Sequence, residues 1–268
     1  MISLTDLRRF KAEGRKFSCL TCYDASFAKA LEVAEVDTIL IGDSLGMTIQ
    51  GHASTLPVNI EDMVYHTQNV ARANSHAFIM ADLPFMSYAT VEDALINSRK
   101  VMQVGAHAVK IEGGAWLADT VRSLTRNGVP VCVHLGLTPQ SVHVFGGYKL
   151  QAKTRSAADQ LLEDCQAVVD AGAALLLLEC VPAVLAKEVA EKFSVPVIGI
   201  GAGVDTDGQV LVIQDMLGLT FGRVARFVRN FMREQSGENA IVDAIKAYHQ
   251  AVLDKTFPAK EHTFQVEL

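Results

Sequence analysis

The hydrophobic residues of this chain are concentrated in eight short runs that recur along the whole sequence. Most of these runs are continuous stretches of Val, Ile, Leu and Ala, and few of them alternate apolar with polar positions. Continuous apolar runs are typical of parallel strands that are covered on both faces. We therefore predict strands at Phe17–Tyr23, Thr38–Gly42, Ala77–Ala81, Ala108–Ile111, Pro130–His134, Ala174–Leu178, Pro196–Ile200 and Val210–Ile213.

Segments with helical character fill most of the gaps between these predicted strands. Thr90 is a suitable N-cap for one of them, with Asp93 at the third helical position. Gly105, Gly128 and Gly172 each stand where a helix C-cap belongs, shortly before the next strand. Helices are accordingly predicted at Ser26–Ala34, Ile60–Asn74, Val91–Gly105, Trp116–Asn127, Ala157–Ala171 and Pro182–Lys192.

An alternation of strand and helix repeated eight times predicts an α/β fold of the (β/α)8 TIM-barrel type. We expect one domain over residues 1–268, with an N-terminal helix and a C-terminal extension of two helices from Arg223 to Lys255. A doubly wound open sheet is the alternative, but no GxGxxG sequence follows the first strand. The later GIGAG sequence, from Gly199 to Gly203, lacks the final glycine of that motif and is interpreted as a tight turn at a barrel rim.

Two segments are longer than ordinary connections between strands and helices. They are Met47–Asn59 and Gly136–Thr154, and both follow predicted strands. In a barrel they would lie on the same rim, so both are candidate lids.

The composition favours a homo-oligomer and argues against a nucleic-acid-binding, membrane or secreted protein. Half of the 268 residues are hydrophobic, which suggests that other subunits of a homo-oligomer cover part of the surface. A formal charge of −6 argues against a general nucleic-acid or anionic-membrane surface. The first residues are charged and lack the apolar core of a signal peptide. The most apolar stretch contains Glu179 and Pro182 and is too short to span a bilayer.

The five cysteines have no framework spacing, and their odd number suggests reduced thiols in a cytoplasm. Cys19 and Cys22 form a CxxC sequence, but it lies within a predicted strand. Three-residue spacing on a strand sends the two thiols to opposite faces, which disfavours a redox or zinc role.

Four carboxylates end four of the apolar runs: Asp43, Asp82, Glu112 and Glu179. Carboxylates at the ends of buried strands are costly unless something needs them there, and in a barrel all four would meet on one rim. Hard oxygen ligands favour Mg²⁺, and the histidines show none of the HxH or HExxH spacings of zinc sites. The sequence therefore suggests metal-assisted chemistry on a small anionic substrate, with helix N-caps or rim salt bridges as the alternative for the aspartates.

Further polar residues accompany these carboxylates. Period-two alternation sends Lys110 and Glu112 to the same face, into the barrel, where the alternative to a function is a buried structural ion pair. Glu179 follows a purely apolar run and should be partly desolvated, which suits a general base unless it forms a barrel-end salt bridge. His134 could bind substrate, donate a proton or fill space, and Ser44 could bind a substrate carboxylate.

Several motifs resemble the ketopantoate hydroxymethyltransferase family. They run in order over most of the chain and include TILIGDSLGMTIQGHASTLPV, MADLPFMSY, AVKIEGG, HLGLTPQ, LLLECVP and IGIGAGVDTDGQVLVIQDMLG. The resemblance implies a (β/α)8 barrel of the phosphoenolpyruvate/pyruvate-type metal-barrel group. It implies transfer of a hydroxymethyl group from 5,10-methylenetetrahydrofolate to 3-methyl-2-oxobutanoate, giving 2-dehydropantoate and tetrahydrofolate in the first step of pantothenate biosynthesis. It also implies Mg²⁺, a cytoplasmic location and a homodecamer of two stacked pentamers.

Carried over position by position, the resemblance makes Asp43 and Asp82 metal ligands and Glu112 a third metal-site carboxylate, acting directly or through water. Glu179 matches the proton acceptor. Asp43, Ser44, Asp82 and Lys110 match substrate contacts. Our predicted substrate-binding set adds His134, and the predicted catalytic residues are Glu179 and Lys110.

Two other functions remain open at this stage. A lyase or mutase of the phosphoenolpyruvate class would share the fold and the metal site, but it needs a cysteine or a phosphate-binding loop near the lid. Cys180 follows Glu179 and should face away from the site if the strand continues. A non-catalytic metabolite-binding barrel is the second alternative, and it would have no use for a base at Glu179.

Overall fold

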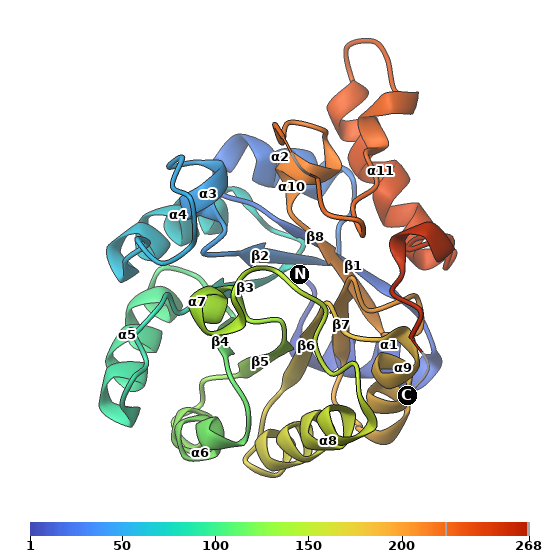
Figure 1. The fold of residues 1–268 in the computed structure, drawn as a ribbon. Helices are drawn as coiled ribbons and strands as arrows, with labels where there is room; N and C mark the ends of the chain where they lie inside the picture. The colour runs from blue at the N-terminus through green and yellow to red at the C-terminus, as the bar shows by residue number, and fades with distance from the viewer. Residues whose placement is uncertain (223, 267–268) are drawn as a thin grey trace.

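Eight parallel strands close into a barrel in sequence order in the computed structural model of the chain (Figure 1). The structure describes residues 1–222 and 224–266. Each strand is hydrogen-bonded to the next, and β8 pairs with β1 to close the ring. The strands are β1 (Phe17–Thr21), β2 (Thr38–Ile41), β3 (Phe78–Asp82), β4 (Ala108–Glu112), β5 (Val131–Gly136), β6 (Leu175–Glu179), β7 (Val197–Ile200) and β8 (Gly208–Leu211). The predicted (β/α)8 barrel is confirmed.

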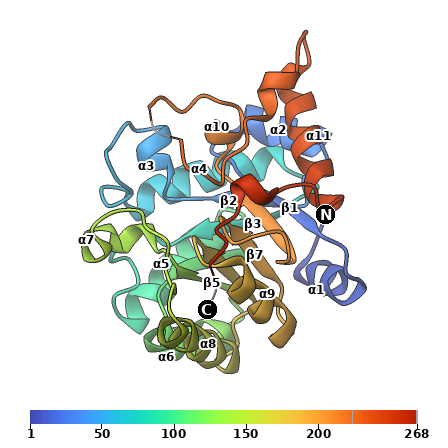
Figure 2. The same cartoon turned by 45° about the vertical axis from the view of Figure 1, so that its right-hand side comes forward.

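Helices form the outer layer around the barrel (Figures 1 and 2). The predicted N-cap is present, because the Thr90 side chain accepts a hydrogen bond from the backbone N–H of Asp93 at 3.1 Å. A short helix at Leu45–Thr48 reaches only the start of the first candidate lid, and another at Val142–Phe145 lies within the second. The helices are α1 (Leu4–Glu13), α2 (Ala25–Val33), α3 (Leu45–Thr48), α4 (Ile60–Ala73), α5 (Val91–Gln103), α6 (Ala118–Arg126), α7 (Val142–Phe145), α8 (Arg155–Asp170), α9 (Ala183–Lys192), α10 (Ile213–Met216) and α11 (Ala240–Leu253), with 3-10 turns at Ala115–Leu117, Pro139–Ser141, Phe231–Glu234 and Lys260–His262.

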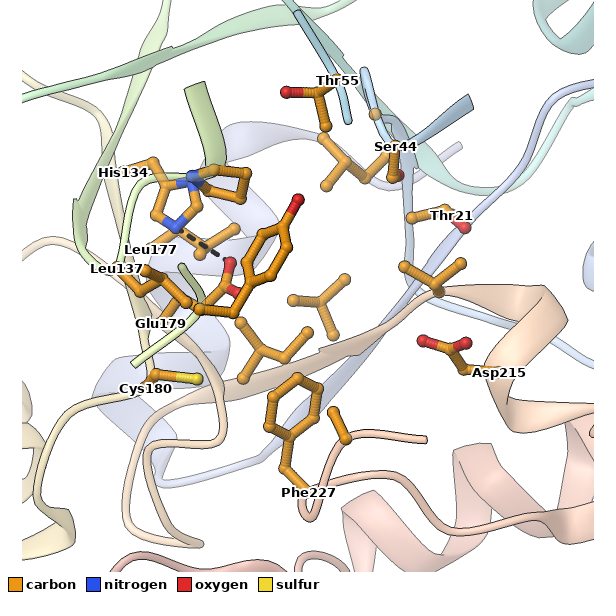
Figure 3. A pocket seen from close by; sticks show the side chains of 18 of the residues that line it. Thr21, Ser44, Thr55, His134, Leu137, Leu177, Glu179, Cys180, Asp215 and Phe227 are labelled. Atoms are coloured by element: carbon orange, nitrogen blue, oxygen red, sulfur yellow. Dashed lines mark ion pairs between the residues drawn. The ribbon is translucent and has the colours of Figure 1, made fainter. Parts of the chain in front are cut away.

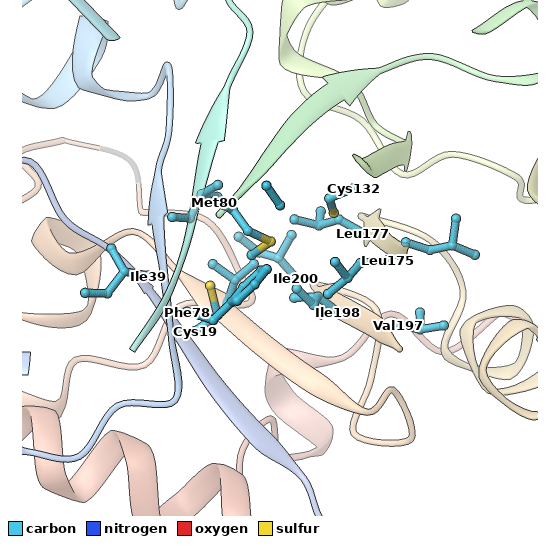
Figure 4. Packing of buried hydrophobic residues seen from close by; sticks show 14 of the residues in the cluster. Cys19, Ile39, Phe78, Met80, Cys132, Leu175, Leu177, Val197, Ile198 and Ile200 are labelled. Atoms are coloured by element: carbon cyan, nitrogen blue, oxygen red, sulfur yellow. The ribbon is translucent and has the colours of Figure 1, made fainter. Parts of the chain in front are cut away.

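Apolar side chains fill the interior of the barrel below the strand ends. Phe78 and Met80 of β3 meet Cys132 of β5 and Leu175 and Leu177 of β6 there (Figure 4). All five are buried. Because side chains alternate along each strand, the residue two positions beyond this layer also points inward. This alternation carries polar residues onto the open rim of an otherwise apolar barrel.

Three details of the sequence prediction are wrong. The β7–β8 connection, residues 201–207, contains no helix, so the alternation of strand and helix is not repeated eight times, although the predicted tight turn at GIGAG is present, with positive φ at Gly201 and Gly203. The last strand begins at Gly208 rather than Val210, so Ile213 already opens α10. The strand that carries Cys19 ends at Thr21, before Cys22. Burial raises the pKa of both thiols to about 12 and keeps them neutral.

The C-terminal region contains one long helix rather than two. The predicted first helix starts at Arg223, which lies outside the described residues, and the chain beyond it forms only the 3-10 turn Phe231–Glu234 before α11. Within the described parts of the chain, no helix is long and apolar enough to cross a membrane.

Tyr248 fixes α11 to the barrel. Its hydroxyl lies 3.0 Å from the Cys19 carbonyl oxygen and 2.8 Å from that of Gln209, and the ring is fully buried. Tyr248→Phe is expected to lower the free energy of unfolding by about 1–2 kcal/mol, because buried carbonyls lose their donor. Urea unfolding measures this loss, with Tyr65→Phe on the exposed face of α4 as the matched control. Equal effects of the two substitutions would contradict this role.

Candidate active site

A cavity of about 730 Å³ opens at the carboxyl ends of the strands. Side chains from β1 to β8, from both candidate lids and from the C-terminal segment line it (Figure 3). The structure brings every predicted site residue into this one cavity: Asp43, Ser44, Asp82, Lys110, Glu112, His134 and Glu179.

The strand register explains how the polar residues meet. Asp82 at the end of β3 is paired with Lys110 of β4, and Glu112 two residues later is paired with His134 of β5. Glu179 ends β6 opposite Gly136. The predicted inward direction of Lys110 and Glu112 is confirmed, since both are buried and face their neighbours' charges.

Lys110 lies between two carboxylates. Its Nζ atom is 3.1 Å from Asp82 Oδ1 and 3.4 Å from Glu112 Oε1. Desolvation opposes the charge on Lys110, but Asp82, Glu112 and Asp43 outweigh it and raise the pKa of Lys110 well above its ordinary value. For Glu112, desolvation is outweighed by Lys110 and His134, which lower the pKa of that carboxyl to about 2. Both groups therefore remain charged in the folded protein.

His134 connects two of the carboxylates. Its Nδ1 atom is 3.1 Å from Glu112 Oε1, and its Nε2 atom is 3.3 Å from Glu179 Oε2 (Figure 3). Desolvation and the nearby Lys110 cation disfavour the imidazolium, but Glu112 and Glu179 outweigh them and raise the pKa of His134 to about 9. At neutral pH the ring is therefore a cation between the two acids: its Nδ1–H donates to Glu112, and its Nε2 side forms an ion pair with Glu179.

Asp43 and Asp82 form a second pair of carboxylates. The backbone N–H of Asp43 donates to Asp82 Oδ2 at 3.0 Å, and both side chains are almost fully buried. Burial and the charges of Asp82 and Glu112 raise the pKa of Asp43 well above its usual range. Ser44 follows Asp43, and its hydroxyl is 2.8 Å from the hydroxyl of Tyr23. A cation beside Asp43 would relieve this crowding of negative charge.

The donor chemistry of this wall fits a hard divalent cation. With all four carboxylates ionised, the negative charges of Asp43, Asp82, Glu112 and Glu179 exceed the positive charges of Lys110 and His134 by two, which one such ion balances. Among the residues that the structure describes, however, no three His, Cys, Asp or Glu side chains stand together as an assembled ligand set. Glu112 does not join Asp43 and Asp82 in such a set, because its oxygens already accept from Lys110, His134 and the Gln140 backbone N–H. The pair Asp43 and Asp82 is the part of the wall most suited to an ion.

Sequence reasoning missed Gln140 and Tyr88. Gln140 is buried in the second lid, where its Nε2 donates to Asp43 Oδ2 at 2.8 Å and to the Leu83 carbonyl at 3.0 Å. Its backbone N–H donates to Glu112 Oε2 at 3.0 Å, and its Oε1 accepts from the Tyr88 hydroxyl at 2.5 Å. Gln140 thus joins two of the carboxylates to a lid. Its place in the HLGLTPQ motif, which begins in β5 and continues into the second lid, is the only signal in the sequence that pointed to it.

The expected direction of Cys180 is wrong. It lines the cavity rather than facing away, as Figure 3 shows. The backbone of Cys180 has a positive φ of 47°, so the alternation of the strand stops at Glu179 and the next side chain turns back. Burial raises the pKa of this thiol, so it remains protonated.

The two candidate lids meet at the cavity. The Tyr148 hydroxyl donates to Met47 Sδ at 3.6 Å, and both residues line the cavity. On the other side, the wall is completed by Asp215 of α10, by residues 224–227 before α11 and by Phe264 after it. Figure 2 shows how the segment after α11 turns back across the barrel. No motif or pattern in the sequence had indicated that this segment takes part.

Known proteins resemble the chain in sequence and in fold. A family model described as ketopantoate hydroxymethyltransferase matches residues 1–260. A 3-methyl-2-oxobutanoate hydroxymethyltransferase of Acinetobacter baylyi is 77% identical, with 100% of both chains covered. One of Psychrobacter cryohalolentis is 59% identical over 98% of this chain and 100% of the relative.

Solved structures are similar in fold at low sequence identity. A phosphonopyruvate hydrolase has a TM-score of 0.63 at 13% identity, covering 82% of this chain and 84% of the other. A 2,3-dimethylmalate lyase of the PEP mutase/isocitrate lyase superfamily has a TM-score of 0.58 at 17% identity, with the same coverage. At these identities the likeness concerns the fold alone.

Proposed function

Because the chain belongs to the ketopantoate hydroxymethyltransferase family, we propose that it transfers a hydroxymethyl group from 5,10-methylenetetrahydrofolate to 3-methyl-2-oxobutanoate. The products are 2-dehydropantoate and tetrahydrofolate, in the first step of pantothenate biosynthesis. The observation that carries the proposal is the position of Glu179, a carboxylate 14% exposed to the cavity and held by His134 on the same wall as Lys110. A base and fixed cations on one wall suit proton abstraction next to a ketone.

Each residue of the site has a separate role in the proposed reaction. Asp43 and Asp82 would hold a Mg²⁺ ion, with Glu112 acting directly or through water, and such an ion polarises a bound 2-oxo acid. Ser44 offers its hydroxyl to the substrate carboxylate. Glu179 removes the proton from C3 of the substrate, and the Lys110 ammonium stabilises the negative charge that develops on the keto oxygen.

The remaining steps join the carbon fragments. The bond from the methylene carbon to folate N10 opens to give an iminium, N10 takes the proton that Glu179 removed, and C3 of the enolate attacks the iminium carbon to form the new C–C bond. Water then supplies the hydroxyl group as the remaining bond from this carbon to N5 breaks, and the proton of the water goes to N5. The lid contact between Tyr148 and Met47 supports a role of both lids in limiting the access of water to the enolate.

The two rival functions lose their support. Burial keeps the Cys180 thiol protonated, so it does not resemble the reactive cysteine that a lyase of the phosphoenolpyruvate class needs. The structures of that class share only the fold. A binding protein without activity does not account for relatives of high identity that carry the name of a transferase.

We also propose a cytoplasmic homo-oligomer, a decamer of two pentamers. Five unpaired thiols suit a reducing compartment. Phe85, Met86 and Trp116 are exposed beside one another on the rim, where a second subunit could cover them. Light scattering coupled to size exclusion measures the assembly size, and a monomer would contradict this part of the proposal.

Exchange of the C3 proton tests the chemistry. The protein is incubated with 3-methyl-2-oxobutanoate in D2O, with and without Mg²⁺, and the C3 signal is followed by NMR. We expect exchange that depends on the metal before any folate is added, and 2-dehydropantoate once 5,10-methylenetetrahydrofolate is supplied. If exchange and product are both absent, with and without tetrahydrofolate, the proposed function is wrong.

Gln140→Leu tests the link between the lid and the carboxylates. The variant keeps the size of the side chain but leaves Asp43 without its 2.8 Å donor. Losing a hydrogen bond to a charged group costs about 1.5–3 kcal/mol, so kcat/KM should fall by about 10- to 100-fold. Calorimetry with Mg²⁺ should show weaker metal binding in parallel. Gln250→Leu on the exposed face of α11 is the control, and equal values for both variants would refute the role.

A further inference from the structure

On the cavity wall opposite Glu179, we propose a subsite for the reduced pterin ring of the folate, with Asp215 as its hydrogen-bond acceptor and Phe227 as its stacking surface. This inference rests on the proposed function, because it names where the second substrate of the same site binds. Asp215 and Phe227 take no part in the chemistry assigned to the other wall. Figure 3 shows Asp215 across the cavity from His134 and Glu179, with Phe227 at the bottom of the view between the two sides.

Asp215 is held so that one of its oxygens is available to a ligand. It lies on α10, which is anchored to β1 because the Ile213 backbone N–H donates to Thr21 Oγ1 at 3.0 Å. The Thr220 hydroxyl donates to Asp215 Oδ1. Within residues 1–222 and 224–266, no hydrogen-bond partner or cation is found for Asp215 Oδ2. The side chain is therefore oriented by Thr220 and open toward the cavity.

An unpaired carboxylate oxygen costs free energy in the largely apolar surroundings of Asp215. The adjoining wall contains Val210, Val212 and Phe227, which are apolar. Burial raises the pKa of Asp215. A carboxyl group in such a place is stabilised by a ligand that brings N–H donors.

A pterin supplies the matching donors. Its 2-amino-4-pyrimidinone edge carries a ring N–H beside an exocyclic amino group, and Asp215 can accept one of these donors on Oδ2 and the other on the lone pair of Oδ1 that Thr220 leaves unused. Phe227 and Phe264 offer aromatic surface in the same cavity. Gly201 makes room for them, because a Cβ atom there would lie 2.8 Å from the Phe227 ring and 3.3 Å from that of Phe264. The end of β7 is thus shaped around these two rings.

The cavity also has space for the remainder of the folate molecule, and a cationic side chain at its opening can pair with the glutamate tail. A cavity of about 730 Å³ lies within the range of about 300–1,000 Å³ for drug-sized ligands, and a five-carbon acid fills only part of it. Arg226 is exposed there, with its Nε–H on the Glu261 carbonyl at 2.9 Å and its guanidinium over Phe264. Its remaining N–H groups suit the carboxylates of the glutamate tail. With the pterin on Asp215 and the tail on Arg226, the methylene between them faces the wall of Glu179.

Binding of tetrahydrofolate and of tetrahydropterin, which lacks the tail, tests the subsite by fluorescence titration of the full-length protein. Asp215→Asn should weaken the binding of both ligands by about 10- to 100-fold, the value of a charge-assisted hydrogen bond. Phe227→Leu should also weaken both. Arg226→Met should weaken only tetrahydrofolate. Asp205→Asn, an exposed aspartate between β7 and β8, is the matched control and should change neither.

The outcomes separate this inference from the function on which it rests. Parental tetrahydrofolate affinity in Asp215→Asn overturns the subsite, while product formation by the parent still supports the transferase. If the parent protein neither binds tetrahydrofolate nor forms product, the proposed function fails and the subsite with it. Thermal unfolding checks that Asp215→Asn is folded, and if it is not, Phe227→Leu alone must show the loss for both ligands.

Discussion

Turnover by the Glu179→Gln variant is expected to fall by about 100- to 10,000-fold, the usual contribution of a general base. Glutamine keeps the shape of the side chain, and its amide oxygen can still face His134 Nε2, which lies 3.3 Å from Glu179 Oε2 in the parent. The amide cannot take up a proton at neutral pH. The substitution therefore removes the base while preserving its surroundings.

The C3 exchange assay isolates this effect from folate binding. Exchange by Glu179→Gln should be lost together with turnover, while calorimetry should show 3-methyl-2-oxobutanoate binding close to that of the parent. Glu163→Gln, on the exposed side of α8, is the matched control. Rapid exchange in Glu179→Gln would mean that another group removes the proton.

The strand-borne half of the site was predictable because it follows local rules. Asp82, Lys110, Glu112 and Glu179 are polar residues at the ends of apolar runs, and the period of two settles which way they point. Neighbouring parallel strands then bring them together without further information. The same rule failed at Cys180, where a positive φ of 47° ends the alternation. Only the backbone geometry reveals that turn.

The loop-borne half was not predictable from one sequence. Gln140 reaches Asp43 across 97 positions of the chain, and no periodicity encodes such a contact. Asp215 and Phe227 belong to segments whose paths depend on how the chain crosses the rim. The missing helix between β7 and β8 has a similar cause, because the glycine-rich turn at 201–207 joins two strands that long-range pairing holds in the barrel.

The Lys110→Met variant should lose both stability and activity, since it removes a buried cation but keeps the length of the side chain. Asp82 and Glu112, with Nζ contacts of 3.1 Å and 3.4 Å, are left without that partner. Breaking a buried ion pair in this way costs about 3–5 kcal/mol. Loss of a group that stabilises a developing oxyanion lowers kcat by about 100- to 1,000-fold.

The stability loss should depend on pH in a defined direction. Lys110 is the largest of the influences that lower the pKa of Glu112 to about 2, below its ordinary 4.5. A depressed folded-state pKa contributes stability that is present above pH 4.5 and is lost as the pH falls toward 2. Without Lys110 the carboxylates of the variant take up protons at higher pH, so its stability falls less on acidification. The gap between parent and variant should therefore be widest near neutral pH and narrow below about pH 5.

Urea unfolding at pH 7.5 and pH 3.5 measures this gap, because the lower pH lies within the range in which the Glu112 contribution is lost. Lys187→Met, at an exposed position of α9, is the control and should change stability by less than about 0.5 kcal/mol at either pH. A gap that stays constant with pH would show that Lys110 stabilises through packing rather than charge. Stability unchanged from the parent, with kcat reduced, would show that the carboxylates are already protonated in the free protein, and that the cation serves the reaction alone.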